Sequence, residues 1–168
     1  MLFRSQVLRH HRALAVRWNG DHSDLIPIEP EAFGIGLAVD TRDGLLVPVI
    51  RNVLKSSLEE ITGESQRLIE RAREGALVRD EMEGGVITLT NLGGYGIDAF
   101  TPIINYPEVA ILGIGSIRRE PVYTDGERIE PRDRMTLSLT FDHAALDGAP
   151  AAAFLRDIVA AIRDPSFG

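Results

Sequence analysis

Apolar and polar residues alternate along the chain in short segments that predict a β-sheet. Residues 34–50 predict two strands around a turn, because residues 42–44, RDG, combine turn-forming side chains with a glycine that accepts a positive φ angle. The second strand, Leu45–Ile50, is almost entirely apolar, and we expect it to be buried on both faces. Pro48 within it has no backbone N–H, so it predicts an edge position or a β-bulge.

Three further strands are predicted in the second half of the chain. Residues 86–92 alternate between apolar and polar positions, and residues 109–117 form an apolar run typical of a buried strand. Residues 134–141 alternate cleanly. The positions that share one face of this last strand are Met135, Leu137, Leu139 and Phe141. Asp125-Gly126 predicts a hairpin turn before it.

Two segments have the three-to-four-residue period of amphipathic helices. Residues 57–74 begin with a capping-box pattern, Ser57 and Glu60, and Gly75 is suited to end the helix. The second helix follows Asp147-Gly148 and extends to about Arg163. The expected core positions are Leu58, Ile61, Leu68, Ile69 and Ala72 in the first helix, and Ala151, Leu155, Ile158 and Ile162 in the second. Residues 7–21 resemble the end of a helix that leads into a turn at Asn19-Gly20.

These elements predict an α/β domain with a mixed sheet in two layers. Some of the strands are joined by hairpins, which does not fit a doubly wound parallel sheet. The chain has 168 residues and shows no internal repeat, low-complexity segment or linker, so we expect a single domain.

Composition and charge narrow the functional classes. A net charge of −7 without a basic cluster argues against a nucleic-acid surface. No apolar run approaches the length of a membrane span, and residues 1–6 show no signal-peptide organisation. The absence of cysteine removes a thiol nucleophile and fits a reducing cytoplasm. Three of the four histidines lie near the N-terminus without ligand spacing, so we expect no metal site.

Several known catalytic and phosphate-binding motifs do not match the residues of this sequence. The glycine-rich turn at residues 93–96, GGYG, follows a strand but matches neither phosphate-binding fingerprint, so it favours a simple turn. No G-x-S-x-G nucleophile elbow occurs, and the carboxylate pairs of the chain fit a solvated surface.

His143 is the strongest remaining candidate for chemistry. It stands where a strand ends and a helix begins, a place where side chains emerge at a sheet edge. Either Asp142 or Asp147 could orient its ring for acid–base work. On the residues alone, a structural histidine is at least as good an interpretation, because a lone histidine at a strand end is more often structural than catalytic.

Residues 142–148, DHAALDG, resemble the D-H-x-x-x-D-G active-site signature of the dihydrolipoyl acyltransferases. These enzymes are the cores of 2-oxoacid dehydrogenase complexes and relatives of chloramphenicol acetyltransferase. Residues 34–51 and 87–115 are similar to the central strand pair and the strand–loop–strand segment of that family, and the Ala-rich last helix is similar too. The likeness covers roughly residues 7–165 and implies the two-layer, mixed-sheet fold of chloramphenicol acetyltransferase.

The resemblance implies acyl transfer between a lipoyl group, presented by a separate lipoyl domain, and the thiol of coenzyme A. His143 would be the general base, and Thr90 matches a Ser/Thr position that donates to the oxyanion. Asp147 matches an Asp/Asn that organises the histidine loop, and Asn91 matches an asparagine to which we assign a structural role. Two simpler readings stay open: Thr90 as an ordinary strand residue, and Asp147 as only a helix N-cap.

The sequence departs from the family pattern in two ways. Ala144 stands where the family usually has an arginine after the histidine, so the loop is either less firmly held or anchored differently. The lipoyl domain, the subunit-binding domain and the first part of the catalytic domain have no counterpart, so we expect residues 1–168 to form a partial catalytic domain, incomplete at its N-terminus.

The partners implied by the resemblance are other copies of the chain and the dehydrogenase components of a complex. The family builds a homotrimer, and from it a larger cubic or icosahedral core, with each active site between two subunits. Two alternatives remain: a non-catalytic fragment that serves only as an assembly module, and a related acyltransferase with a hydroxyl acceptor.

Overall fold

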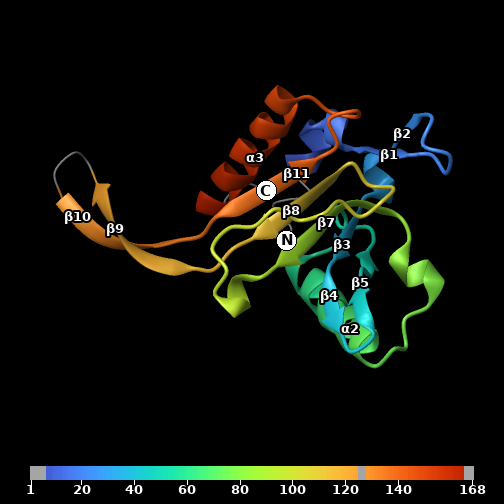
Figure 1. Cartoon of the computed structure of the whole chain (residues 1–168), viewed down its shortest axis with the longest axis horizontal. Coiled ribbons are helices and arrows are strands. Elements are labelled where there is room, and N and C mark those ends of the chain that lie inside the picture. The colour runs from blue at the N-terminus through green and yellow to red at the C-terminus, as the bar shows by residue number, and fades with distance from the viewer. Residues whose placement is uncertain (1–6, 125–127, 165–168) are drawn as a thin grey trace.

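The computed structural model describes residues 7–124 and 128–164. Its centre is a mixed five-stranded sheet in the order β11-β8-β7-β3-β6 (Figure 1). The strands of this sheet are β3 (Gly34–Leu37), β6 (Val49–Ile50), β7 (Gly85–Asn91), β8 (Ala110–Ile114) and β11 (Leu137–Phe141). β7 runs parallel to both β3 and β8, whereas the edge strands β6 and β11 run antiparallel to their neighbours.

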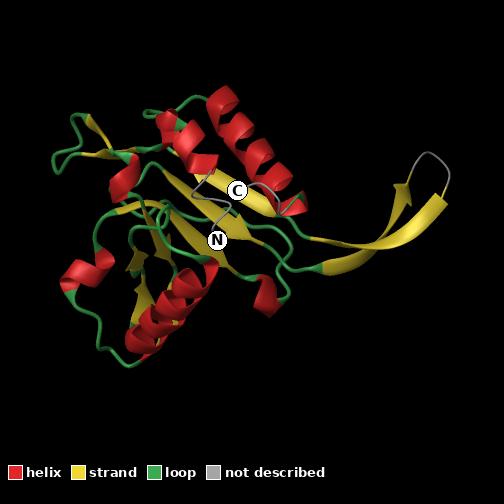
Figure 2. Cartoon of the chain, turned by 180° about the vertical axis from the view of Figure 1, so that it is seen from behind, coloured by secondary structure: helices red, strands yellow, loops and turns green. Residues whose placement is uncertain are grey.

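Two long helices, α2 (Leu58–Arg73) and α3 (Gly148–Arg163), cover one face of this sheet (Figure 2). Both helices contribute to a single apolar core together with the sheet. Its largest fully buried side chains include Ile35, Ile87 and Leu112 from the sheet, Ile61 and Leu68 from α2, and Phe154 and Ile158 from α3. The predicted two-layer α/β arrangement is therefore confirmed.

The ends of the helices follow local sequence signals. Ser57 Oγ accepts from the Glu60 backbone N–H at 3.2 Å, and Glu60 Oε2 accepts from the Ser57 N–H at 2.7 Å, so the predicted capping box is present. The predicted core faces need correction. Leu58 is exposed, and in α3 the buried positions include Phe154 and Ala161, whereas Leu155 and Ile162 are only half-buried.

The two strands predicted in residues 34–50 are each broken into two. β3 and β6 join the main sheet, and between them β4 (Val39–Thr41) and β5 (Gly44–Leu46) form a separate antiparallel ribbon. Pro48 lies directly before the short edge strand β6, as expected for a residue without a backbone donor. Leu45 is exposed, so burial of the whole predicted strand is wrong.

A long hairpin, β9 (Arg118–Thr124) and β10 (Arg128–Arg134), projects away from the body of the domain (Figure 1). Its two strands pair over their full length, so the predicted hairpin is confirmed, although the turn residues Asp125-Gly126 lie outside the described part. Large apolar side chains on it are open to solvent, among them Tyr123 and Ile129. A partner surface could therefore bury them.

The N-terminal region differs from the predicted helix-and-turn. Residues 7–10 are helical, a short 3₁₀ turn η1 spans Arg12–Leu14, and β1 (Val16–Trp18) then pairs with β2 (Leu25–Pro27). The predicted turn at Asn19-Gly20 is therefore part of a hairpin. In the described ranges, no helix is both long enough and apolar enough to cross a membrane.

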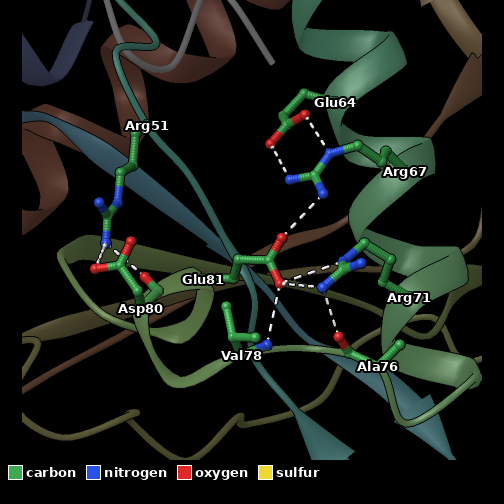
Figure 3. A network of polar contacts seen from close by, with 8 residues as sticks. All are labelled: Arg51, Glu64, Arg67, Arg71, Ala76, Val78, Asp80 and Glu81. Carbon is green, nitrogen blue, oxygen red and sulfur yellow. Dashed lines mark hydrogen bonds and ion pairs between the residues drawn. The ribbon is translucent and has the colours of Figure 1, made fainter.

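A polar network fastens α2 to the loop that precedes β7 (Figure 3). At its centre is Glu81 in η3 (Arg79–Met82), whose carboxylate accepts from Arg67 at 2.9 Å, from Arg71 at 3.0 Å and from the backbone N–H of Val78 at 3.1 Å. Hydrogen bonds to Val78 and Arg67 lower the pKa of Glu81 to about 2. The Glu81 carboxylate thus accepts from several donors at once, whereas a carboxylate in an isolated surface ion pair has a single partner.

We expect Glu81→Gln to lower the melting temperature at pH 7 by a few degrees, because the amide can satisfy only some of these donors. A depressed pKa contributes stability above the unfolded pKa near 4.5, and this contribution is lost as pH falls toward 2. The difference in melting temperature from wild type, followed by circular dichroism, should therefore shrink between pH 5 and pH 2.

The matched control is Glu83→Gln, which removes an exposed pair between Glu83 and Arg79. Its melting temperature should stay within about one degree of wild type, as expected for a solvated pair on one short helical turn. An equal loss in both variants would contradict a special role for Glu81.

Candidate functional site

His143 stands directly after the edge strand β11, in the turn that leads into α3. Its side chain is 74% exposed. The contacts of the ring are a tilted approach to Phe141, with centroids 5.5 Å apart, and Asp147, whose Oδ1 lies 3.9 Å from Nδ1. The imidazole is thus open to a molecule approaching from outside the chain.

Asp147 occupies the N-cap position of α3, as predicted, but its side chain makes no capping hydrogen bond within the described structure. The side chain is 88% exposed and lies on the Nδ1 side of the His143 ring. The reading of Asp147 as only an N-cap therefore finds no support in its side-chain contacts.

Asp142 fixes the turn that carries His143. Its backbone N–H donates to Val109 O at 2.9 Å, and its carbonyl accepts from Ala145 and Leu146 at 3.1 and 3.0 Å. Oδ1 accepts from the Ala144 N–H at 2.9 Å, and these two groups belong to the residues on either side of His143. The Ala144 N–H and the indole of Trp18 lower the pKa of Asp142.

Thr90 lies near the end of β7, half-buried, and pairs with Gly113 of β8. Its hydroxyl makes no hydrogen bond to the residues that the structure describes, so it is available as a donor. The ring of Phe100 packs over Gly113 on the neighbouring strand. A Cβ atom added at Gly113 would lie only 2.9 Å from this ring. An aromatic side chain therefore lies close to Thr90, and Tyr95, the other candidate lining residue, is exposed.

The structure does not bring Thr90 and His143 together. Thr90 is level with Gly113, which is paired in turn with Ser138 of β11. Phe141, at the far end of β11, lies three residues beyond Ser138, about 10 Å along the strand, and His143 is further still. The two candidate residues therefore lie toward opposite ends of the sheet, two strands apart.

The glycine-rich segment after Thr90 forms a turn. Asn91 Oδ1 accepts from the Gly93 N–H at 2.9 Å, in agreement with a structural role for Asn91. Gly96 has a φ of 76°, in the left-handed region that favours glycine. Within residues 7–124 and 128–164, no cluster of three His, Asp or Glu side chains could hold a metal ion.

A buried acidic group, Glu108, was missed by sequence reasoning. It is 3% exposed, and neither its Oε2 nor the hydroxyl of buried Thr88 has a hydrogen-bond partner in the described structure. Burial raises the pKa of Glu108 to about 7. Gly36 and Gly85 leave the space that its carboxyl group occupies, since a Cβ on either would approach Glu108 Oε1 within 3.3 Å. The available signal was Gly36 within a predicted strand and Gly85 directly before another.

Comparison with known proteins adds to this geometry. The family described as 2-oxoacid dehydrogenases acyltransferase (catalytic domain) matches residues 3–167. The chain belongs to this family. The dihydrolipoyllysine-residue acetyltransferase component of the pyruvate dehydrogenase complex from Azotobacter vinelandii is 50% identical over 132 residues, which are 77% of this chain and 20% of that protein. The predicted family and fold are confirmed.

Two solved structures have the same fold as this acyltransferase-family chain. One addresses the role of a serine, a histidine and an asparagine in the catalytic mechanism of Azotobacter vinelandii dihydrolipoamide acetyltransferase, with a TM-score of 0.89 and 39% identity. The other is the cubic core of a pyruvate dehydrogenase multienzyme complex, with a TM-score of 0.89 and 40% identity. Each comparison covers 97% of this chain and 67% of the other chain.

The chain thus spans about a fifth of the length of its Azotobacter relative and about two thirds of these two solved chains. In the Azotobacter enzyme the histidine and the asparagine are four residues apart, and the serine lies about fifty residues before the histidine.

Glu108 gives a pH test of the fold. A raised folded-state pKa means that the carboxyl group contributes most to stability below its unfolded pKa of about 4.5, and that this contribution is lost as pH rises through 7. We expect Glu108→Gln, which carries no charge at any pH, to melt at a higher temperature than wild type at pH 8. At pH 5 the two should melt alike. Thermal unfolding at both pH values measures this, and equal melting curves at pH 8 would contradict a buried ionised Glu108.

Proposed function

We propose that this chain is an acyltransferase that moves an acyl group between dihydrolipoamide and coenzyme A. The observation that carries the proposal is the exposed His143, with Asp147 3.9 Å from its Nδ1, at the end of β11 in a chain of this family. The four-residue spacing of His143 and Asp147 equals that of the histidine and asparagine of the Azotobacter enzyme, and Thr90 lies at about the corresponding distance before them.

Each residue has a role that follows from its chemistry. With Nδ1 facing Asp147 and the ring exposed, Nε2 of His143 is free to take the proton of the coenzyme A thiol, as a general base does. The sulfur then forms a bond to the thioester carbon, and the carbonyl electron pair moves onto oxygen. When that intermediate collapses, the lipoyl carbon–sulfur bond breaks, and the departing thiolate receives the proton from His143.

The developing oxyanion needs a donor that is fixed in advance. The Thr90 hydroxyl, half-buried at the end of a rigid strand, is suited to this role. One such donor contributes on the order of 3 kcal/mol to the stability of the transition state. Acyl transfer of this kind takes both sulfurs from the substrates, so a chain without cysteine can carry it out.

The site that we propose lies between two copies of the chain. Thr90 and His143 stand toward opposite ends of one sheet, so the Thr90 end of one copy would meet the His143 end of the next. The projecting β9–β10 hairpin, with its exposed apolar side chains, provides a surface for such a contact (Figure 1). We propose a homotrimer, within a larger core that binds dehydrogenase components and receives the lipoyl group from a lipoyl domain. The likeness to a cubic core supports this assembly.

The first experiment removes the base. We expect His143→Ala to lower the rate of acetyl transfer from acetyl-coenzyme A to dihydrolipoamide by about 10²–10⁴-fold, the usual contribution of a general base. The control is His10→Ala, which removes an exposed histidine near the N-terminus and should keep the full rate. If a folded, trimeric wild-type protein shows no transfer that depends on His143, the chain is an assembly module instead.

The second experiment tests whether the site is shared. His143→Ala and Thr90→Val should each be nearly inactive alone. Mixed and allowed to exchange subunits, they should recover about a quarter of the wild-type rate, because one subunit contact in four then pairs an intact His143 with an intact Thr90. If activity does not recover although mass spectrometry verifies subunit exchange, either both residues act within one chain or Thr90 is not part of the site.

The alternative of a related acyltransferase with a hydroxyl acceptor is tested by competition. Acyl transfer to a hydroxyl acceptor in the presence of dihydrolipoamide would favour that alternative.

A further inference from the structure

The turn that carries His143 is anchored by a contact from a distant part of the chain. The indole Nε1–H of Trp18, in β1, donates to Asp142 Oδ2 at 2.8 Å across 124 residues of sequence. Figure 1 shows the β1–β2 hairpin beside the loop that leads from β11 into α3. The other oxygen of the same carboxylate accepts from Ala144 N–H, so Asp142 joins Trp18 to the backbone on the far side of His143.

Trp18 is itself held from several directions. Its backbone N–H donates to Pro107 O at 2.9 Å, and its ring stacks on His22 with centroids 4.0 Å apart. His22 stacks in turn on Tyr106, whose hydroxyl donates to Asn19 O at 2.7 Å. The indole can therefore support the carboxylate, since contacts other than the one with Asp142 also hold Trp18 in place.

The side chain at position 144 gives the turn no polar anchor. Ala144 has only a methyl group, and the ring of His143 is largely exposed. Besides its contacts with Phe141 and Asp147, His143 is positioned by its backbone, which the Asp142 carboxylate holds through the Ala144 N–H. A shift of about 1 Å at a general base lowers a rate substantially, because proton transfer needs the donor and acceptor within hydrogen-bond reach.

We propose that Trp18 is a positioning residue for His143, which acts by holding the Asp142 carboxylate and through it the turn on both sides of the histidine. This inference rests on the proposed acyl transfer, with His143 as its base. It assigns to an indole N–H in a separate hairpin the task of keeping that base in place.

The test is Trp18→Phe, which removes the N–H donor and keeps an aromatic ring to stack on His22. We expect kcat for acyl transfer to fall about tenfold, the size expected when a hydrogen bond to a charged group is lost. KM for coenzyme A should stay unchanged, because Trp18 would not touch the substrate. Asp142→Asn should produce a similar loss, since an amide can accept from only one of the two donors.

A double-mutant cycle shows whether Trp18 acts through Asp142. Trp18→Phe combined with Asp142→Asn should be no slower than the slower single variant, because both remove the same contact. Multiplied losses would mean that Trp18 acts independently of Asp142 and would overturn the proposal. The matched control is Ser23→Ala, which removes hydrogen bonds to Asn19 and Asp21 in the β1–β2 turn, away from Asp142. It should leave kcat unchanged.

A second measurement does not require activity. In NMR spectra of wild type, the ring resonances of His143, assigned by comparison with His143→Gln, should be sharp and dispersed. In Trp18→Phe they should broaden or move toward the positions of a free histidine, and in Ser23→Ala they should not change. Unchanged His143 resonances in Trp18→Phe would overturn the proposal. A wild-type protein with an ordered His143 that depends on Trp18, but without transfer activity, would refute only the proposed function.

Discussion

The register of the central sheet is the constraint on which the proposed site depends. β7 and β8 run parallel and β11 returns antiparallel to them, so the residues that leave the ends of β7 and β11 point to opposite edges. Backbone hydrogen bonds lock this arrangement, and a slip of one residue would move every core side chain to the wrong face. Thr90 and His143 therefore cannot be brought together by a loop movement within one chain.

The parts of the structure outside the sheet hold the two ends of the site in different ways. At the Thr90 end, support is local: Asn91 closes the turn that follows, and Phe100 packs on the next strand. At the His143 end, support comes from far along the sequence, through the β1–β2 hairpin and Trp18. The proposed base, His143, thus depends on correct packing of the N-terminal residues, whereas the proposed donor, Thr90, depends on segments close to it in the sheet.

What the sequence predicts well is local. The capping box at Ser57 and Glu60 and the bounds of α3 follow from residues within one or two turns of each other. Residue chemistry alone made His143 a candidate, with Asp142 or Asp147 to orient it, but left its role open. The family resemblance implied the roles of His143 and Asp147 and added Thr90. The break of residues 34–50 into four strands, the burial of Glu108 and the Trp18–Asp142 bond could not be predicted, because each depends on which distant segments pack together.

An arrangement with one half of a site at each end of the subunit makes contacts between copies head-to-tail. Head-to-tail contacts differ from self-complementary ones in the number of sites that they complete. An open row of subunits leaves one His143 without a partner at one end of the row and one Thr90 without a partner at the other. Only a closed ring uses every half-site. If the proposed site is formed in this way, the activity per chain would depend on whether the ring is closed. Full activity would be expected only in closed assemblies, where every subunit has a neighbour on both sides.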